Sequence, residues 1–233
     1  MTAPRAWQVV LDAVERDLLD GRLSPGDHLP PERTLAADLG VGRSSVREAL
    51  RVLEVLGLIR TAVGSGPSAG AIIVARPGGG MSALMRLQVA AQGFAVADVV
   101  KTRLVLEGSI VTDLAAAGSP DLAASAQILT AMENQTLTEA EFLALDAAFH
   151  LSLAEASGNQ VVTATMAGLR SAIEGYARAG AAGLANWPAT SARLMLEHRG
   201  ILAAILAGEA DAARLAMHTH ISGYYAETHL RDH

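Results

Sequence analysis

Residues 26–60 read GDHLPPERTLAADLGVGRSSVREALRVLEVLGLIR and place two short helical patterns on either side of a glycine-containing turn. Pro31 followed by Glu32 is typical of a helix start, because a proline at that position leaves no N–H unpaired. This first pattern ends at Gly40. The second is expected to begin at Ser45, where Ser, Val, Arg and Glu in residues 45–48 match a capping box. Two helices joined in this way predict a helix-turn-helix.

The flanking sequence extends this prediction to a winged helix-turn-helix. Residues 7–19 carry apolar side chains at helical spacing and predict a preceding helix. Residues 58–63 and 71–74 are short β-prone runs separated by glycine, serine and proline, which predicts a β-hairpin. Residues 75–80 are rich in proline and glycine, so we expect a linker there.

The rest of the chain is predicted to be helical. Beyond residue 81 there are helical patterns broken by glycine, proline and polar stretches, and no convincing strand pattern. Six or seven helices are expected, and the fold class is therefore mainly α. The predicted organisation is a winged-helix domain in residues 1–76, a linker and connecting helix in 77–94, and an all-α helical bundle in 95–233.

Composition excludes several classes of protein. The 233 residues are 51% hydrophobic but only 3% aromatic, which favours packed helices with an aliphatic core over β-sandwiches. Because the chain has no cysteine, disulfides and thiolate zinc sites are excluded, and any metal ion must be bound by His, Asp or Glu. No long apolar run or signal peptide is visible, so we expect a cytoplasmic protein with no membrane partner.

The distribution of charge points to nucleic acid despite a net charge of -6. Residues 1–77 contain nine arginines and nine acidic residues, so the acidic surplus lies entirely in the remaining sequence. Arg43, Arg47 and Arg51 recur every four residues and share one helix face, opposite an apolar face. This pattern suits a recognition helix, because arginine binds guanine or phosphate in the major groove of DNA. A solvated helix face is the alternative interpretation.

Other residues of this region are candidates for further DNA contacts. Arg33 begins the helix before the recognition helix, where it is placed to contact the DNA backbone. Ser44 and Ser45 can add phosphate or base contacts. The small residues 64–66 would let the hairpin approach the minor groove closely.

Four residues of the helical domain form a candidate metal site. Asp146 and His150 lie four residues apart on one helix and project from one face. His198 lies on an apolar stripe of a later helix. In the last helix His218 and His220 point in different directions, and the apolar stripe there favours His220. Taken alone, each histidine suggests a structural role. An ion pair between the aspartate and one histidine is a second alternative, but it would account for only two of the four residues. Burying all four without a cation would be costly.

The first part of the sequence resembles the winged-helix domain of the GntR family of regulators. The resemblance is carried by residues 26–36, 39–41, 43, 46–50, 53 and 57–59. It implies that Arg33, Arg43 and Arg47 contact the operator and that Gly66 enters the minor groove. Gly42 stands where the family usually has serine, and the segment 64–70 is longer than the usual wing turn.

The second part resembles the metal-containing branch of the FadR subfamily, with its helical FCD-type effector domain. The matches are residues 101–107, 146–150 with 157–159, 197–198 before Ile201, and 212–217 with His220. This resemblance implies that Asp146, His150, His198 and His220 hold a divalent ion, zinc with nickel or manganese as alternatives. It also implies a carboxylate effector, and these ligands argue against the acyl-CoA-binding branch. Arg103 and Asn159 are the candidate effector-binding residues, although Arg103 can instead pair with Glu107.

Together these features predict a repressor, and not an enzyme, that binds a palindromic operator as a homodimer. A small organic or sugar acid bound at the metal would change its affinity for the operator. A metal-dependent hydrolase is the rival, and the attached winged helix, the four ligands and the lack of an evident general base weigh against it. A regulator with a purely structural metal is the second alternative.

Overall fold

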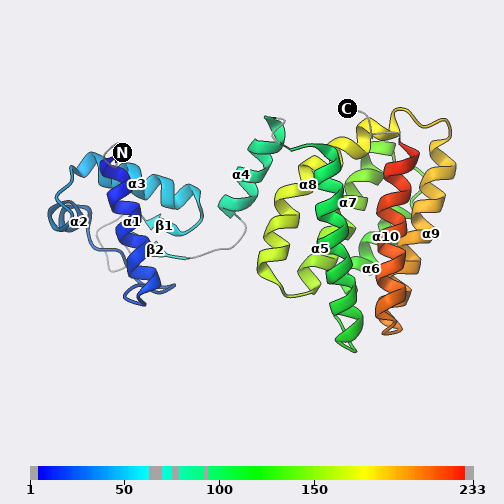
Figure 1. Ribbon diagram of the computed structural model, residues 1–233, viewed down its shortest axis with the longest axis horizontal. Coiled ribbons are helices and arrows are strands. Elements are labelled where there is room, and N and C mark those ends of the chain that lie inside the picture. Colours follow the sequence, from blue (N-terminus) through cyan, green and yellow to red (C-terminus); the bar gives the residue numbers. More distant parts are fainter. Residues whose placement is uncertain (1–4, 63–69, 75–78, 92–93, 229–233) are drawn as a thin grey trace. The chain divides into compact units, whose positions relative to one another are not determined.

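The computed structural model describes residues 5–62, 70–74, 79–91 and 94–228 (Figure 1). The chain divides into two compact units, Met1–Met81 and Ser82–His233. Each unit has its own cluster of buried apolar side chains, as expected of a domain that folds around one core. The predicted fold class is confirmed, because a helix-turn-helix with a two-stranded hairpin precedes a set of helices.

The first unit is a small helical domain closed by a hairpin. Its described elements are α1 (Ala6–Leu19), α2 (Glu32–Asp38), α3 (Arg43–Val55), β1 (Ile59–Ala62) and β2 (Gly70–Ile73). α1 and α2 both pack on α3. The strands pair antiparallel, with Ile59 opposite Ile73 and Ala62 opposite Gly70. Ile59 and Ile73 are both buried against the helices, so the hairpin covers one side of this core.

Both helices of the helix-turn-helix end in the same way. Gly40 after α2 and Gly57 after α3 have positive φ, at 64° and 72°, which favours glycine. After α3, the N–H of Gly57 donates to Glu54 and the N–H of Leu58 donates to Leu53, each at 3.0 Å. These two bonds form a Schellman motif, which ends the helix sharply and turns the chain into β1.

The structure corrects two of the predicted boundaries. α3 begins at Arg43 instead of Ser45, because Gly42 is extended and its carbonyl accepts from the N–H groups of Ser45 and Val46. Its N-cap makes no side-chain hydrogen bond, so the predicted capping box is wrong. The second correction concerns α4 (Gly79–Ala90), which begins inside the segment expected to be a linker.

The second unit consists of helices in the part of the chain that the structure describes. After α4 they are α5 (Val96–Ala116), α6 (Ala123–Met132), α7 (Glu139–Ala156), α8 (Gln160–Ala181), α9 (Trp187–Leu206) and α10 (Ala210–Glu227). α10 lies between α5 and α9 and packs on both (Figure 1). α7 packs on α5, α6 and α8. The buried side chains are mainly aliphatic, and Phe149 on α7 is fully buried among them.

Two titratable residues are buried on each of α5 and α7. Arg103 and Glu107 are buried on α5, and Asp146 and His150 are buried on α7. Buried charged groups are costly unless other groups compensate them, so these positions mark a site inside the domain. None of the described helices is long and apolar enough to cross a bilayer.

Candidate nucleic-acid interface and candidate metal centre

The predicted DNA contacts lie on the exposed surfaces of α2 and α3. Arg33, Arg43, Ser44 and Arg47 are exposed, and Ser45 is half-buried. Val46 and Leu50 on the other face of α3 are buried, so the helix presents its arginines outward. The predicted contact Gly66 lies outside the described residues.

The N-terminus of α3 is suited to an anion. Its first turn contains no acidic residue, and no side chain caps it. Because the first N–H groups of a helix have no partner within the helix and carry a partial positive charge, phosphate binds well at such an end. The corrected start at Arg43 places both Arg43 and Ser44 in this first turn.

Arg47 makes an ion pair that the sequence did not indicate. Its Nε lies 3.0 Å from Oε2 of Glu32 at the start of α2. The two side chains are 60% and 42% exposed, and an exposed pair of this kind contributes only about 0–1 kcal/mol. Arg47 can therefore exchange Glu32 for a DNA group at little cost.

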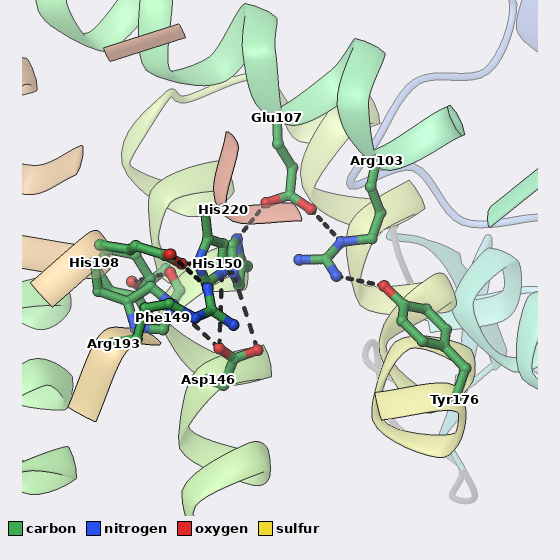
Figure 2. Close-up of polar contacts among 11 residues, drawn as sticks. Arg103, Glu107, Asp146, Phe149, His150, Tyr176, Arg193, His198 and His220 are labelled. Atoms are coloured by element: carbon green, nitrogen blue, oxygen red, sulfur yellow. Dashed lines mark hydrogen bonds and ion pairs between the residues drawn. The ribbon is translucent and has the colours of Figure 1, made fainter. Parts of the chain in front are cut away.

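Four buried side chains from three helices meet inside the second unit (Figure 2). Asp146 and His150 come from α7, His198 from α9 and His220 from α10, and each offers one ligand atom within 4.8 Å of the others. These are the four residues expected from the sequence, and we call them the His/Asp cluster. His218 is exposed and does not join it.

Four distances within the His/Asp cluster lie in the range expected for ligands around one ion, and all of its ligand atoms lie within 4.8 Å of one another. Nε2 of His150 lies 3.2 Å from Nε2 of His220, and Nε2 of His198 lies 3.1 Å from Oδ1 of Asp146. Asp146 also lies 3.9 Å from Nε2 of His220 and 4.0 Å from Nε2 of His150. Ligands bound at about 2.1 Å from one ion are separated by about 3 to 4 Å.

Two further carboxylates contact the Nδ1 atoms of two histidines of the cluster. Glu107 contacts Nδ1 of His150, and Oε2 of Glu197 lies 2.9 Å from Nδ1 of His220. An ionised carboxylate only accepts hydrogen bonds, so in the neutral rings each Nδ1 carries the proton. The Nε2 atoms of His150 and His220 then present lone pairs to the cluster, as in metal-bound histidines.

The His/Asp cluster passes a test for a cation on its own geometry. The Nε2 atoms of His150 and His220 lie 3.2 Å apart, and if both rings carry their proton on Nδ1, neither can donate to the other, whereas a cation would accept both lone pairs. His198 is fully buried, and neither of its ring nitrogens has a hydrogen-bond partner within the described structure, because the approach to Asp146 is poorly directed. A divalent cation would satisfy these nitrogens and the carboxylate together. Three imidazoles and one carboxylate therefore fit a first-row divalent metal.

The electrostatics keep the ligands in their metal-binding forms. Burial raises the pKa of Asp146, but the close approach of His198, together with His150 and His220, outweighs burial and holds that pKa well below its usual range. Burial also opposes ionisation of Glu107, yet the charge of Arg103 and the contact with His150 lower its pKa to about 2. Burial and the neighbouring His198 lower the pKa of His220 to about 4, so this ring is neutral near pH 7.

Arg103 pairs with Glu107, and one of its guanidinium nitrogens is without a partner among the described residues. Its Nε donates to Oε1 of Glu107 at 2.6 Å, and Nη1 donates to the hydroxyl of Tyr176 at 2.5 Å (Figure 2). Nη2 is buried without a hydrogen-bond partner among the described residues. Arg103, Asp146, Tyr176 and His220 border a cavity of about 10 Å³ beside the His/Asp cluster.

Asn159 has a different role from the one expected. Its side chain is exposed and accepts from the N–H of Val162 at 3.2 Å, which caps α8. It is not among the residues that border the cavity next to the His/Asp cluster. The effector role expected for Asn159 stays a prediction, and the contact that its side chain makes in the structure is the cap of α8.

Comparison with known proteins adds an independent observation. Residues 7–67 match the family described as "Bacterial regulatory proteins, gntR family", and residues 98–223 match the FCD domain. The two matches cover the helix-turn-helix with its first strand and the helices that hold the His/Asp cluster.

Similar proteins match this chain along most of their length. The Glc operon transcriptional activator of Escherichia coli strain K12 is 30% identical over 220 residues, 92% of this chain and 85% of that protein. The transcriptional repressor NanR of Edwardsiella tarda strain FL6-60 is 31% identical over 236 residues, 95% and 85% of the two chains. The structure of a Streptococcus agalactiae GntR protein superposes with a TM-score of 0.64 at 26% identity and covers 98% of this chain and 100% of that one.

These relatives are regulators, not enzymes, so the hydrolase alternative is wrong. The matched domains also agree with the resemblance to FadR-like regulators. The chain is a DNA-binding transcriptional regulator and belongs to the gntR family of bacterial regulatory proteins, in the group that carries an FCD domain.

Proposed function

We propose that this regulator changes its affinity for an operator when a small organic or sugar acid binds beside a divalent metal ion in the FCD domain. The observation that carries the proposal is the buried His/Asp cluster, in which unpaired imidazole nitrogens and a carboxylate converge on one point. Asp146, His150, His198 and His220 would hold the ion. It would supply a positive charge to which an acid's oxygens can bind.

Zinc is the ion we propose, with nickel or manganese as alternatives. Three imidazole nitrogens and one carboxylate oxygen do not discriminate strongly among first-row divalent metals. Four protein ligands leave up to two positions of an octahedral ion for the acid. The unused Nη2 of Arg103, next to the cluster, is the second proposed anchor, because a guanidinium donates readily to a carboxylate.

The size of the cavity suggests how binding is coupled to movement. About 10 Å³ holds about one water molecule, so an organic acid requires the surrounding side chains to move. Arg103 on α5, Tyr176 on α8 and His220 on α10 border this space. Closely packed helices resist continuous deformation, and entry of an acid would shift them relative to one another.

The DNA-binding side of the proposal uses the exposed face of α2 and α3. Arg33, Arg43, Arg47 and the serines at 44 and 45 would contact DNA, and Gly66 would approach the minor groove. One winged helix reads one half-site, so we propose that a homodimer binds a palindromic operator in the cytoplasm. The related proteins include an activator and a repressor by name, and we propose repression that the acid relieves.

The first test is metal analysis of the purified chain together with a thermal-shift screen of small organic and sugar acids. We expect about one divalent ion per chain and an acid that raises the melting temperature only when metal is present. Chelation followed by Zn²⁺ should abolish and restore this response. Absence of bound metal after incubation with Zn²⁺, Ni²⁺ and Mn²⁺ would overturn the proposal. Metal-dependent stability with no response to any acid would instead favour a purely structural ion.

A further inference from the structure

Two arginine–glutamate pairs reach the His/Asp cluster from different helices. On α5, Arg103 pairs with Glu107, which contacts Nδ1 of His150. We call Arg103 and Glu107 the α5 arm. Both side chains are almost completely buried, with exposures of 6% and 1%. Figure 2 shows Glu107 between the arginine and the histidine.

The second pair repeats this arrangement on α9. Arg193 Nη1 lies 2.5 Å from Oε1 of Glu197, and Oε2 of Glu197 lies 2.9 Å from Nδ1 of His220. We call Arg193 and Glu197 the α9 arm. Arg193 also contacts Glu227 and is 36% exposed, and Glu197 is 22% exposed. The α9 arm therefore has the same order of groups as the α5 arm but is open to solvent.

The glutamate of each arm decides which ring nitrogen of its histidine carries the proton. Imidazole has two neutral tautomers, and a hydrogen bond at one ring nitrogen decides which nitrogen carries the proton. A carboxylate paired with arginine stays ionised and accepts, so it holds the proton on Nδ1. The same nitrogen, Nε2, is thus left free in both rings.

We propose that Glu107 and Glu197 are positioning residues that hold His150 and His220 in the Nδ1–H tautomer and so present both Nε2 atoms for metal binding. The metal part of this inference rests on the proposed function, whereas the tautomer part does not. Arg193 supports Glu197 through a half-exposed ion pair, which water weakens, so its loss has a smaller effect than loss of Glu197. The α9 arm is the testable one, because removing a partner from the fully buried α5 arm leaves an uncompensated charge.

The chain contains a matched control for the α9 arm. Arg170 and Glu174 on α8 form an ion pair with the same spacing, and their exposures of 39% and 22% are close to those of Arg193 and Glu197. Among the described contacts Glu174 pairs with arginines and not with a histidine. Glu174→Leu therefore removes an equivalent pair without touching the His/Asp cluster.

The experiment compares the full-length wild type with Glu197→Leu, Glu197→Gln, Arg193→Ala and Glu174→Leu. The first measurement is the tautomer of each histidine in the metal-free chain, from the ¹⁵N chemical shifts of the ring nitrogens. We expect Nδ1–H for His150 and His220 in the wild type. Glu197→Leu should shift His220 toward Nε2–H, and Glu197→Gln should retain Nδ1–H because the amide oxygen still accepts.

The second measurement is Zn²⁺ affinity by competition with a chromophoric chelator. Loss of a carboxylate that orients a metal-binding histidine typically weakens binding about 10–100-fold, which is the change we expect for Glu197→Leu. Glu197→Gln and Arg193→Ala should lose less Zn²⁺ affinity than Glu197→Leu, and Glu174→Leu should bind Zn²⁺ as tightly as the wild type. Circular dichroism and thermal melting show whether each variant is folded.

An Nε2–H tautomer at His220 in the wild type overturns the proposal, as does an unchanged tautomer in folded Glu197→Leu. Zn²⁺ affinity equal in Glu197→Leu and the wild type overturns it as well. If the wild type binds no Zn²⁺ but Glu197→Leu still changes the tautomer of His220, the positioning role is supported and the proposed metal function fails. Failure of the positioning role and failure of the proposed metal function are therefore distinguishable.

Discussion

His198 shows how much a single buried residue can indicate. It is fully buried, and both its ring nitrogens lack a hydrogen-bond partner in the described part of the chain. A buried polar group without a partner costs about 1–3 kcal/mol, so such a group is retained when something else compensates it. Its neighbours are Asp146 and two other imidazoles, and a cation is the species that all four would bind.

Replacement of this ligand should abolish stabilisation by metal. We expect Zn²⁺ at about 100 times its Kd to raise the free energy of unfolding of the wild type by about 2.7 kcal/mol. His198→Leu should lose this increment, because one of four ligands is gone. His218→Leu, at an exposed position of α10, should retain it. Denaturant unfolding with Zn²⁺ or with a chelator measures the difference, and full Zn²⁺ stabilisation of His198→Leu would contradict the assignment.

Arg47 is the residue on which DNA recognition depends most in our proposal. It is exposed on α3, and within the described residues its one ion pair is the weak pair with Glu32. A bidentate arginine contact contributes about 1–3 kcal/mol, so Arg47→Ala should weaken binding to the specific operator about 5- to 150-fold. Fluorescence anisotropy with an operator selected from random DNA measures this effect. Arg16→Ala, exposed on α1, is the control and should bind normally; an equal effect of both changes would refute a specific role.

Residue patterns predicted the members of the His/Asp cluster but not the groups that orient them. Helical spacing grouped Asp146 with His150 and distinguished His220 from His218, because both inferences use contacts within one helix. The partners Glu107 and Glu197 belong to other helices than the histidines they contact, so no local spacing reveals them. Arg103 illustrates both cases, because its pairing with Glu107 follows from the i,i+4 spacing whereas its contact with Tyr176 does not.

At the scale of elements, α7 is the helix that positions the cluster. Its start is well defined, because Thr138 Oγ1 accepts from the N–H of Glu141 while Glu141 Oε2 accepts from the N–H of Thr138 at 2.8 Å. This capping box satisfies two N–H groups at the helix N-terminus. The same motif was predicted for α3 at Ser45 and is absent there, because the extended Gly42 starts that helix earlier. The sequence pattern alone does not separate the two cases.

Removal of the cap should destabilise the FCD domain measurably. Thr138→Ala removes the hydroxyl that accepts from Glu141, and loss of such a cap costs about 1 kcal/mol. Thr130→Ala on α6 removes a hydroxyl that bonds only to the carbonyl one turn earlier, so its effect should stay below about 0.5 kcal/mol. Urea unfolding of both variants, without metal, makes the comparison. Equal stabilities would show that the cap does not define the start of α7.

At the scale of the whole molecule, the proposed function requires the two units to communicate. Elements and domain content were predictable from hydrophobic periodicity and from turn residues, because these are local features. The coupling between the FCD domain and α3 is not local, and it can exist only if the acid binds two arrangements of the chain with different affinity. The small cavity beside Arg103 and His220 provides the physical reason for such a difference, since an acid does not fit without movement.

The most direct test of acid sensing is the operator Kd of the full-length chain, measured by fluorescence anisotropy with Zn²⁺ and a stabilising acid from the screen. We predict that saturating acid changes this Kd by about 5- to 150-fold, the usual range of coupling between two sites. The change should disappear after chelation and in His150→Ala. An operator Kd that stays the same when the metal-loaded chain is saturated with acid would contradict the proposed function.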